Sequence, residues 1–562
     1  MRHLPRACLL VPVLLTACHA PATSPSPDTP SAAMRASRPS TASAHTTPDA
    51  HATPAVAAMQ VGASGKASVA AGGKPGAATT PAPAPAPGAQ AAQLMASTDL
   101  VHTAGRTPSA EIEAYRPAVT AIVREALLHG QAFDKLASLV ATAPHRLSGS
   151  PGAAAAVEWV RAALLADGQE NVTLEPCMVP HWVRGDVAEC SIVAPPELAG
   201  ERFPILALGG SVATAEAGLA AEVVEITSWE QLDQLADAVS GKLLFFNRPM
   251  DASLLDSFPA YGGAVDQRGR GASEAARRGG VGALVRSMTT RLDDVPHTGA
   301  MHYAEGVARV PTAAISTCGA ERLAALLHAG QRVSLRLRLD CRTLPDAPSA
   351  NVLGEIVGSE LPDEVVVMGG HLDCWDVGQG ASDDGGGVCQ CLEALRLIRA
   401  TGCKPRRTIR VVAFMNEENG SRGAHAYFED HRPVLDRHLL AIESDAGSFT
   451  PRGFSTSASG PALETLSDIA ALLADTGLSW IKAGGSGGAD VDPMRAAGVT
   501  VMGYRPDDQR YFDLHHSESD TLAQVSPREI NLSAACLAAM AYVVADREER
   551  LPRSPISEDG ED

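Results

Sequence analysis

Short apolar runs alternate with helical patterns in the second half of this 562-residue chain, and this alternation constrains the fold most. The runs cover Glu364–Met368, Thr408–Met415 and Leu439–Glu443. The first is almost continuously apolar and glycines follow it, as expected for a strand buried on both faces of a parallel sheet. Helical patterns follow from about Gly387 to Arg399 and from Ser421 to Asp430. The pattern predicts an α/β fold, a mostly parallel mixed sheet sandwiched by helices.

Polar side chains follow each of these predicted strands. His371 comes after the first run, Glu417 and Glu418 after the second, and Asp445 after the third. The carboxyl ends of strands are where open α/β sheets gather their sites. A single histidine or a Glu-Glu pair is more often structural or solvated, but together these residues predict a metal site.

Two further segments add donors of the same kind. Asp383 and Asp384 lie on the glycine-rich stretch 380–387, and His515 and His516 precede the last predicted helix, which opens at Ser526 with a capping box. Imidazole and carboxylate without sulfur suit Zn²⁺, and a pair of ions about 3.5–4 Å apart would share one carboxylate. One of two adjacent glutamates could then be a ligand and the other a base for amide hydrolysis.

Long strings in this region resemble the carboxypeptidase Q-like branch of the di-zinc aminopeptidase family, metallopeptidases that also include the transferrin receptors. The strings are residues 370–380, 383–387, 417–418, 443–447 and 515–517. The resemblance covers roughly residues 110 to 550. It implies the zinc-exopeptidase fold with an inserted protease-associated domain.

The resemblance also implies roles for single residues. His371 and Asp445 would hold one zinc, Glu418 and His516 the other, and Asp383 would bridge both. His516 is preferred to its neighbour because the family places this ligand four residues before an Asp-Thr pair.

Glu417 would be the general base and acid in this family. Asp373 and Asp384 would support the ligands, and Asp373 would fix the tautomer of His371. Cys374 stands where the branch has serine, and we interpret it as a small buried residue rather than a ligand.

The implied activity is that of an exported exopeptidase with two Zn²⁺ per chain. It would hydrolyse dipeptides or short peptides with a free N-terminus, with a metal-bridged hydroxide as nucleophile and Glu417 as base. The resemblance also suggests a homodimer. The alternatives are a glutaminyl cyclase-type acyltransferase, which keeps one zinc on the same fold, and a catalytically dead surface binding protein. His371 together with Glu417-Glu418 favours the two-metal hydrolase, and the complete ligand set argues against a dead scaffold.

The first residues predict export. Residues 1–18 have a basic start, the short apolar stretch Leu9–Leu15 and a lipobox-like ending at Cys18, which we expect to be lipidated. No acidic residue comes directly after Cys18, which favours sorting to the outer membrane. We therefore expect the protein in the periplasm or at the cell surface, with the lipid as its contact with the membrane. Residues 19–105 are rich in Ala, Pro and Thr and predict a disordered tether. The net charge of −19 argues against nucleic acid as a partner.

Composition divides the rest of the chain. Residues 106–200 would form the N-terminal part of the peptidase domain, 201–330 the insertion, 331–550 the catalytic part and 551–562 a tail. The insertion carries short strand-like runs without a cluster of metal-type residues. Cys177 and Cys190 flank a predicted strand pair and could form a disulfide in an oxidising compartment.

Overall fold

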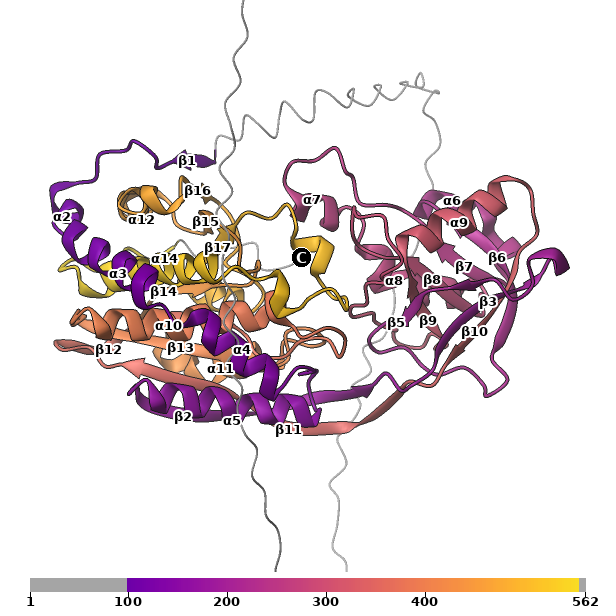
Figure 1. The fold of residues 1–562 in the computed structure, drawn as a ribbon, viewed down its shortest axis with the longest axis horizontal. Helices are drawn as coiled ribbons and strands as arrows, with labels where there is room; N and C mark the ends of the chain where they lie inside the picture. Colours follow the sequence, from indigo (N-terminus) through magenta and orange to yellow (C-terminus); the bar gives the residue numbers. More distant parts are fainter. Residues whose placement is uncertain (1–98, 555–562) are drawn as a thin grey trace, which may run out of the picture. The chain divides into compact units, whose positions relative to one another are not determined.

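The computed structural model describes residues 99–554 (Figure 1). Cys18, the predicted signal and most of the predicted tether lie outside the described residues. The prediction of a disordered tether up to residue 105 is wrong at its end, because β1 (Leu100–His102) pairs with β16 (Trp480–Ala483). The start of the predicted tail also packs on the protein, since Leu551 is fully buried.

A nine-stranded mixed sheet forms the centre of the peptidase part. Its order is β1, β16, β15 (Pro451–Thr456), β17 (Thr500–Pro506), β14 (His438–Glu443), β12 (Leu361–His371), β13 (Arg407–Phe414), β11 (Arg342–Ile356) and β2 (Glu170–Val183). The central strands β17, β14, β12 and β13 run parallel. Antiparallel pairs occur on both sides, β15 with β17 and β13 with β11 with β2. Strands β15 and β16 also run parallel, so four of the eight neighbouring pairs are parallel and the sheet is mixed, with fewer parallel pairs than the predicted mostly parallel sheet.

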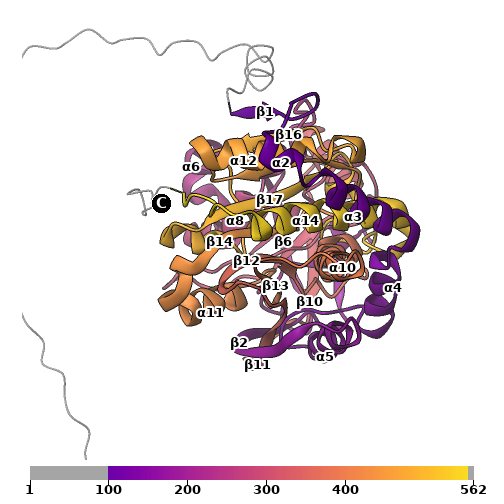
Figure 2. The same ribbon diagram turned by 90° about the vertical axis from the view of Figure 1, so that its left-hand side faces the viewer.

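Helices cover both faces of this sheet, because side chains of the central strands alternate between two cores. Val366 and Met368 of β12 belong to one hydrophobic core, and Val365 and Val367 to the other. The first core takes in α3 (Arg116–His129), α4 (Ala132–Thr142), α5 (Pro151–Ala166), α10 (Gly386–Ala400), α12 (Gly460–Ala471) and α14 (Pro527–Asp546). The second is covered by α11 (Arg422–His431), as Figure 2 shows. A short helix, α2 (Ala110–Glu113), precedes α3.

Helix α14 is the central helix of the first core. Among the described helices it is long and apolar enough, by length and composition, to cross a membrane, yet 78% of its most apolar window is buried inside the protein. It packs on α10 and α3. Its start has the expected geometry, since the Ser526 side chain accepts a hydrogen bond from Glu529 N. Its apolar character thus serves the core.

A second, eight-stranded sheet lies in the inserted region. Its order is β4 (Arg202–Phe203), β3 (Ala188–Ala194), β10 (Ser334–Leu339), β6 (Leu219–Ile226), β7 (Leu243–Phe246), β8 (Gly282–Arg286), β9 (Thr312–Ile315) and β5 (Ile205–Ala207). Helix α9 (Thr317–His328) packs on one face, and α6 (Trp229–Leu235), α7 (Ser257–Gly262) and α8 (Asp266–Arg277) pack on the other.

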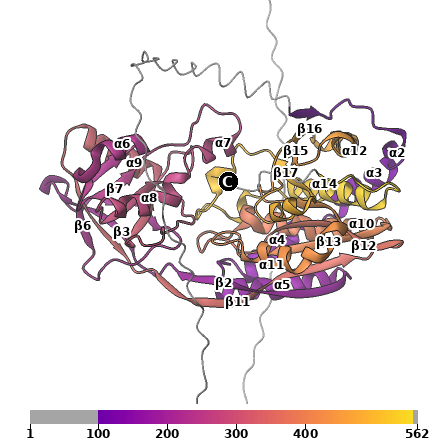
Figure 3. The same ribbon diagram turned by 180° about the vertical axis from the view of Figure 1, so that it is seen from behind.

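The insertion extends beyond the predicted boundaries of 201–330, because its sheet includes β3 and β10. Strands β2 and β11 pair from Arg342 with Val183 to Glu355 with Glu170 and connect the two sheets as a long ribbon (Figure 3). Cys177 and Cys190 are free, buried thiols, so the expected disulfide is absent between these two described residues.

The insertion also packs against the peptidase part. Tyr511 and Phe512 of α13 (Tyr511–Leu514) belong to the same hydrophobic core as α7 and α8. Phe512 stacks on Tyr261 with ring centroids 4.6 Å apart. Because His515 and His516 directly follow α13, the packing of α13 on the insertion supports one side of the predicted site.

Candidate metal centre

The central parallel strands deliver the predicted ligands to one edge of the sheet. His371 is the last residue of β12, Glu418 follows β13 and Asp445 follows β14. Because β14, β12 and β13 are neighbours in the sheet, these side chains meet although they are far apart in sequence. Asp383 reaches them from the turn 381–385 before α10, and His516 from the loop after α13.

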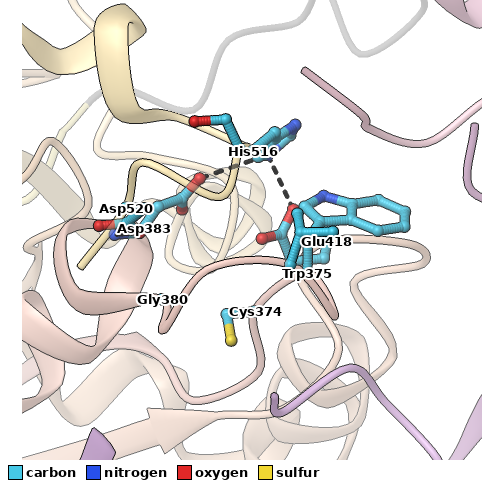
Figure 4. A pocket seen from close by; sticks show the side chains of 9 residues that line it. Cys374, Trp375, Gly380, Asp383, Glu418, His516 and Asp520 are labelled. Carbon is cyan, nitrogen blue, oxygen red and sulfur yellow. Dashed lines mark hydrogen bonds and ion pairs between the residues drawn. The ribbon is translucent and has the colours of Figure 1, made fainter. Parts of the chain in front are cut away.

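Asp383 lies between two pairs of side chains. Its Oδ1 is 3.1 Å from His371 Nε2, which is 3.6 Å from Asp445 Oδ1. Its Oδ2 is 3.3 Å from His516 Nε2, which is 2.9 Å from Glu418 Oε2. Figure 4 shows the second pair, with His516 directed at both carboxylates. One carboxylate thus offers an oxygen to each of two imidazole–carboxylate pairs.

The polar atoms at this position fit a cation. Asp383 Oδ2 and both carboxylate oxygens of Glu418 are buried without a hydrogen-bond partner among the described residues. Burial, together with repulsion from Asp383, holds the pKa of Glu418 well above its usual range. Burial and the adjacent His515 hold the pKa of His516 well below its usual range, so its imidazole is neutral, the form that binds metals. Neutral imidazole with carboxylate oxygen is a donor set that suits zinc.

His515 is the other imidazole at this end of the site. Its Nε2 lies 3.8 Å from Asp383 Oδ2, and its ring stacks on His516 with centroids 3.5 Å apart. Asp383, His515 and His516 can also be grouped around one ion. His516 is closer to Asp383 than His515 is, and it also contacts Glu418, so the geometry favours His516.

Asp384 binds the backbone around the ligands. Its Oδ2 accepts a hydrogen bond from His371 N at 3.0 Å and its Oδ1 one from Gly387 N at 3.0 Å. A Cβ at Gly387 would lie 1.8 Å from the Ser444 carbonyl oxygen, which explains part of the glycine-rich sequence. Asp384 therefore acts on the position of His371 through the main chain.

Asp373 has a different contact from the one expected. Its carbonyl oxygen, at 2.9 Å, is the near neighbour of His371 Nδ1, whereas its carboxylate Oδ1 is 3.8 Å away. The carboxylate instead accepts hydrogen bonds from Asn416 N at 2.7 Å and Glu417 N at 3.0 Å. The main chain of Asp373 thus orients the imidazole, and its side chain holds the loop that carries the two glutamates.

Asp520 is a functional residue that sequence reasoning missed. It accepts hydrogen bonds from Ser382 N at 2.7 Å and Asp383 N at 3.1 Å, and it is buried. Burial, with the charge of Asp383, raises its pKa to about 7. In the sequence it serves only as a landmark four residues after His516, and no local pattern indicates that it holds the central carboxylate.

Arg146 was also missed, because it comes from the N-terminal part of the chain. It is fully buried and donates to the carbonyls of Leu372 at 2.8 Å, Gln379 at 2.9 Å and Gly380 at 2.8 Å. These bonds hold the loop between His371 and Asp383.

Glu417 differs from the other carboxyls of the centre. Its side chain is half-buried and makes no hydrogen bond or ion pair with a residue of the range 99–554. Burial, opposed by His371 and reinforced by the charge of Asp445, raises its pKa to about 7. A carboxyl group with such a pKa can take a proton and return it near neutral pH.

Cys374 faces away from the centre. Its sulfur accepts a hydrogen bond from Arg146 N at 3.4 Å and lies 3.8 Å from the Pro144 carbonyl oxygen. Burial raises its pKa to about 11, so it is a thiol rather than a thiolate. A cavity of about 10 Å³ separates it from Glu418 and His516 (Figure 4).

Comparison with known proteins agrees with this arrangement. Residues 351–541 match the model of peptidase family M28. Carboxypeptidase Q from Homo sapiens is 38% identical over 424 residues, which cover 75% of this chain and 87% of that protein. Carboxypeptidase Q from Pongo abelii is 37% identical over 447 residues, covering 79% of this chain and 92% of the relative.

Solved structures show the same fold. The peptidase M28 precursor from Shewanella amazonensis superposes with a TM-score of 0.75 at 34% identity, covering 79% of this chain and 99% of that chain. A zinc aminopeptidase from Bacillus subtilis shares the fold at 17% identity, with a TM-score of 0.55, over 75% of this chain and 95% of its own. The chain therefore belongs to peptidase family M28 and is a metallo-exopeptidase related to carboxypeptidase Q.

Proposed function

We propose that this chain hydrolyses dipeptides or short peptides with a free N-terminus at a centre of two zinc ions. The observation that carries the proposal is Asp383, which offers one oxygen to the pair His371–Asp445 and the other to the pair His516–Glu418. A glutaminyl cyclase-type centre would need only one of these pairs.

The bound ions would supply Lewis-acid polarisation of the scissile carbonyl and a water molecule of lowered pKa. The chain's own residues then perform the proton transfers. Glu417 takes the proton of the attacking water and returns it to the nitrogen of the leaving amine. Asp373 holds the main chain of Glu417 at 3.0 Å, so the carboxyl is presented from a fixed loop.

The free N-terminus of the substrate has an acidic environment to enter. Asp445 is partly exposed, the charge of Asp445 raises the pKa of the buried Glu443, and Glu443 accepts a hydrogen bond from Asp490 N at 2.8 Å. In a dipeptide the bond beside the N-terminal residue is also the bond beside the C-terminal one. The name carboxypeptidase Q of the relatives is therefore compatible with cleavage next to the N-terminal residue.

The proposal extends to the rest of the chain. The segment with the second sheet would be a protease-associated domain, and the protein would be exported and lipidated at Cys18, so that the lipid is its contact with the outer membrane. Two chains would form a homodimer.

Lipidation is measured by mass spectrometry of the purified N-terminal peptide from the wild type and from Cys18→Ala.

The function is tested with purified protein, elemental analysis and a panel of dipeptides, amidated peptides and N-acetylated peptides. We expect zinc in the protein, hydrolysis of free dipeptides and no hydrolysis of N-acetylated ones. Glu417→Gln should retain the zinc of the wild type and lose turnover. Full activity in Glu417→Gln would contradict the role of the base, and cyclisation of N-terminal glutamine without dipeptide hydrolysis would favour the cyclase.

A further inference from the structure

Trp375, on the loop after β12, carries a buried hydrogen-bond donor without an acceptor. The residue is 2% exposed, and its indole Nε1–H has no hydrogen-bond partner within residues 99–554. The adjacent Trp182 is also buried, but its indole Nε1–H donates to the Ser211 carbonyl oxygen at 3.0 Å. Because burying an N–H group without an acceptor is costly, the position of Trp375 indicates an acceptor that this group serves.

Acceptors without a donor lie beside the same small cavity. Trp375 lines it together with Asp383, Glu418 and His516. Among the described residues that line it, Trp375 supplies the buried donor without a partner, and Asp383 Oδ2 and both carboxylate oxygens of Glu418 are the buried acceptors without one. Figure 4 shows the Trp375 ring next to the Glu418 carboxylate, with Asp383 across the cavity. The unsatisfied donor and the unsatisfied carboxylate oxygens therefore share one cavity.

Glu418 is a better acceptor for this donor than Asp383. Each oxygen of Asp383 lies near the Nε2 atom of a different imidazole, His371 or His516, so both oxygens point to the expected ions. Oε2 of Glu418 is 2.9 Å from His516 Nε2 and points the same way. Oε1 of Glu418 is the remaining oxygen, and no described residue donates to it. Carboxylates that bind a metal are usually hydrogen-bonded by a residue behind them, and Oε1 lacks such a donor.

The inserted region fixes the position of the indole ring. A Cβ on Gly209 would lie 1.9 Å from the ring carbon Cη2 of Trp375, so the glycine lets the backbone of the insertion lie directly against the ring. This backbone is itself held, since Gly209 N donates to the Gly299 carbonyl oxygen at 2.9 Å and the Gly209 carbonyl oxygen accepts from Met301 N at 3.0 Å. Trp182 contacts the indole edge to face, with ring centroids 6.3 Å apart.

Arg184 joins the insertion to the same ring. Its guanidinium carbon lies 5.0 Å from the Trp182 ring centroid and 5.9 Å from that of Trp375. The guanidinium forms an ion pair with Asp376, the residue after Trp375, and donates to the carbonyl oxygen of Ala207 in β5 of the insertion. The indole is therefore held between the ribbon and the insertion, and its nitrogen lies at the metal centre.

We propose that Trp375 is a positioning residue, whose indole N–H donates to Glu418 and holds this carboxylate in place for one of the two metal ions. The insertion, through Gly209, holds the indole. The inference rests on the proposed function, because Glu418 is a ligand only in a metal centre. It concerns one end of that centre, since His371 and Asp445 do not line the cavity that Trp375 shares with Glu418.

The test measures zinc affinity by competition with a chelator in two variants that each keep one ligand pair. His371→Ala keeps the pair His516–Glu418, and His516→Ala keeps the pair His371–Asp445. Trp375→Phe retains an aromatic ring and removes the N–H. Added to His371→Ala, it should weaken zinc binding about 10- to 100-fold, the usual effect of losing a group that orients a metal ligand. Added to His516→Ala, it should leave the affinity unchanged, which controls for misfolding.

Three further substitutions are made in the His371→Ala protein. Trp182→Phe removes the indole N–H of the neighbouring ring and should leave zinc affinity unchanged. Gly209→Ala should weaken zinc binding as Trp375→Phe does, because its Cβ displaces the indole. Gly282→Ala is its control: its Cβ would lie 2.9 Å from a side-chain carbon of Leu219 within the insertion, so it should lower the melting temperature and keep the zinc affinity.

Equal zinc affinity with and without Trp375→Phe in the His371→Ala protein would overturn the proposal. An equal loss with Trp182→Phe, or an equal loss in the His516→Ala protein, would also overturn it, because the effect would then come from general packing. If neither single-pair protein bound zinc, the two-zinc centre of the proposed function would fail instead.

Discussion

Asp520→Asn tests how the central carboxylate is held in place. The two carboxylate oxygens of Asp520 each accept a main-chain N–H, from Ser382 at 2.7 Å and from Asp383 at 3.1 Å. Asparagine keeps one acceptor oxygen and turns an NH₂ group toward the other N–H. The substitution therefore removes one hydrogen bond to a charged acceptor and leaves a buried donor without a partner.

The size of the effect follows from these bonds. Above pH 7, where the Asp520 carboxyl is ionised, a hydrogen bond to this charged group contributes about 1.5–3 kcal/mol, and every 1.4 kcal/mol is a factor of about ten in an equilibrium constant. Because the lost bond positions the residue that faces both ligand pairs, we expect zinc affinity to fall about 10- to 100-fold. This range is also typical of groups that orient metal ligands.

The assay is competition for zinc with a chelator of known affinity, followed by activity at saturating zinc. Asp340→Asn is the matched control, because Asp340 also accepts two main-chain N–H groups, from Asp186 at 3.1 Å and Val187 at 2.8 Å, in the inserted region. It should lower the melting temperature and keep wild-type zinc affinity. Equal zinc affinity in Asp520→Asn and the wild type would refute the reasoning.

Three further predictions concern stability and the thiol. Cys374→Ser should keep the zinc content and the activity of the wild type, because the sulfur faces the Arg146 main chain; loss of zinc would make it a ligand. Gly387→Ala should destabilise the fold by about 1–3 kcal/mol in denaturant unfolding, since its Cβ would meet the Ser444 carbonyl oxygen. In metal-free protein, burial raises the pKa of Glu417 from 4.5 to about 7 and that of Glu418 well above 4.5. Folded values above unfolded ones favour folding at low pH, and this contribution is lost as pH rises from about 4 to 8. The melting temperature of chelator-treated protein should therefore fall relative to the zinc-loaded form between about pH 5 and 8, and a constant difference would contradict this.

The central strands and the residues that follow them could be predicted because their signals are local. Strands β12, β13 and β14 each contain a short apolar run, and a polar residue stands at or just after the carboxyl end of each. Strands β2 and β11 were harder to predict, since β2 is largely exposed and β11 is exposed over its first half and buried over its second, along a ribbon that leaves the domain. The insertion is longer than predicted because its sheet includes β3 and β10.

The groups that support the centre could not be predicted, because their contacts are set by tertiary packing. Arg146 acts on carbonyl groups more than two hundred residues away, and Arg268 reaches His516 from helix α8 of the insertion. Neither lies in a motif. The carboxylate of Asp373 was expected to contact the imidazole of His371. It instead accepts hydrogen bonds from the main-chain N–H groups of Asn416 and Glu417, which come from the end of a different strand.

The measurement that tests the account most directly is the zinc content of the wild type, His371→Ala and His516→Ala by elemental analysis. The two pairs around Asp383 predict two zinc ions per wild-type chain and a loss of one ion in each variant, with melting temperature reporting that the fold persists. One zinc in the wild type, or two retained in either folded variant, would contradict a centre in which Asp383 joins two ligand pairs.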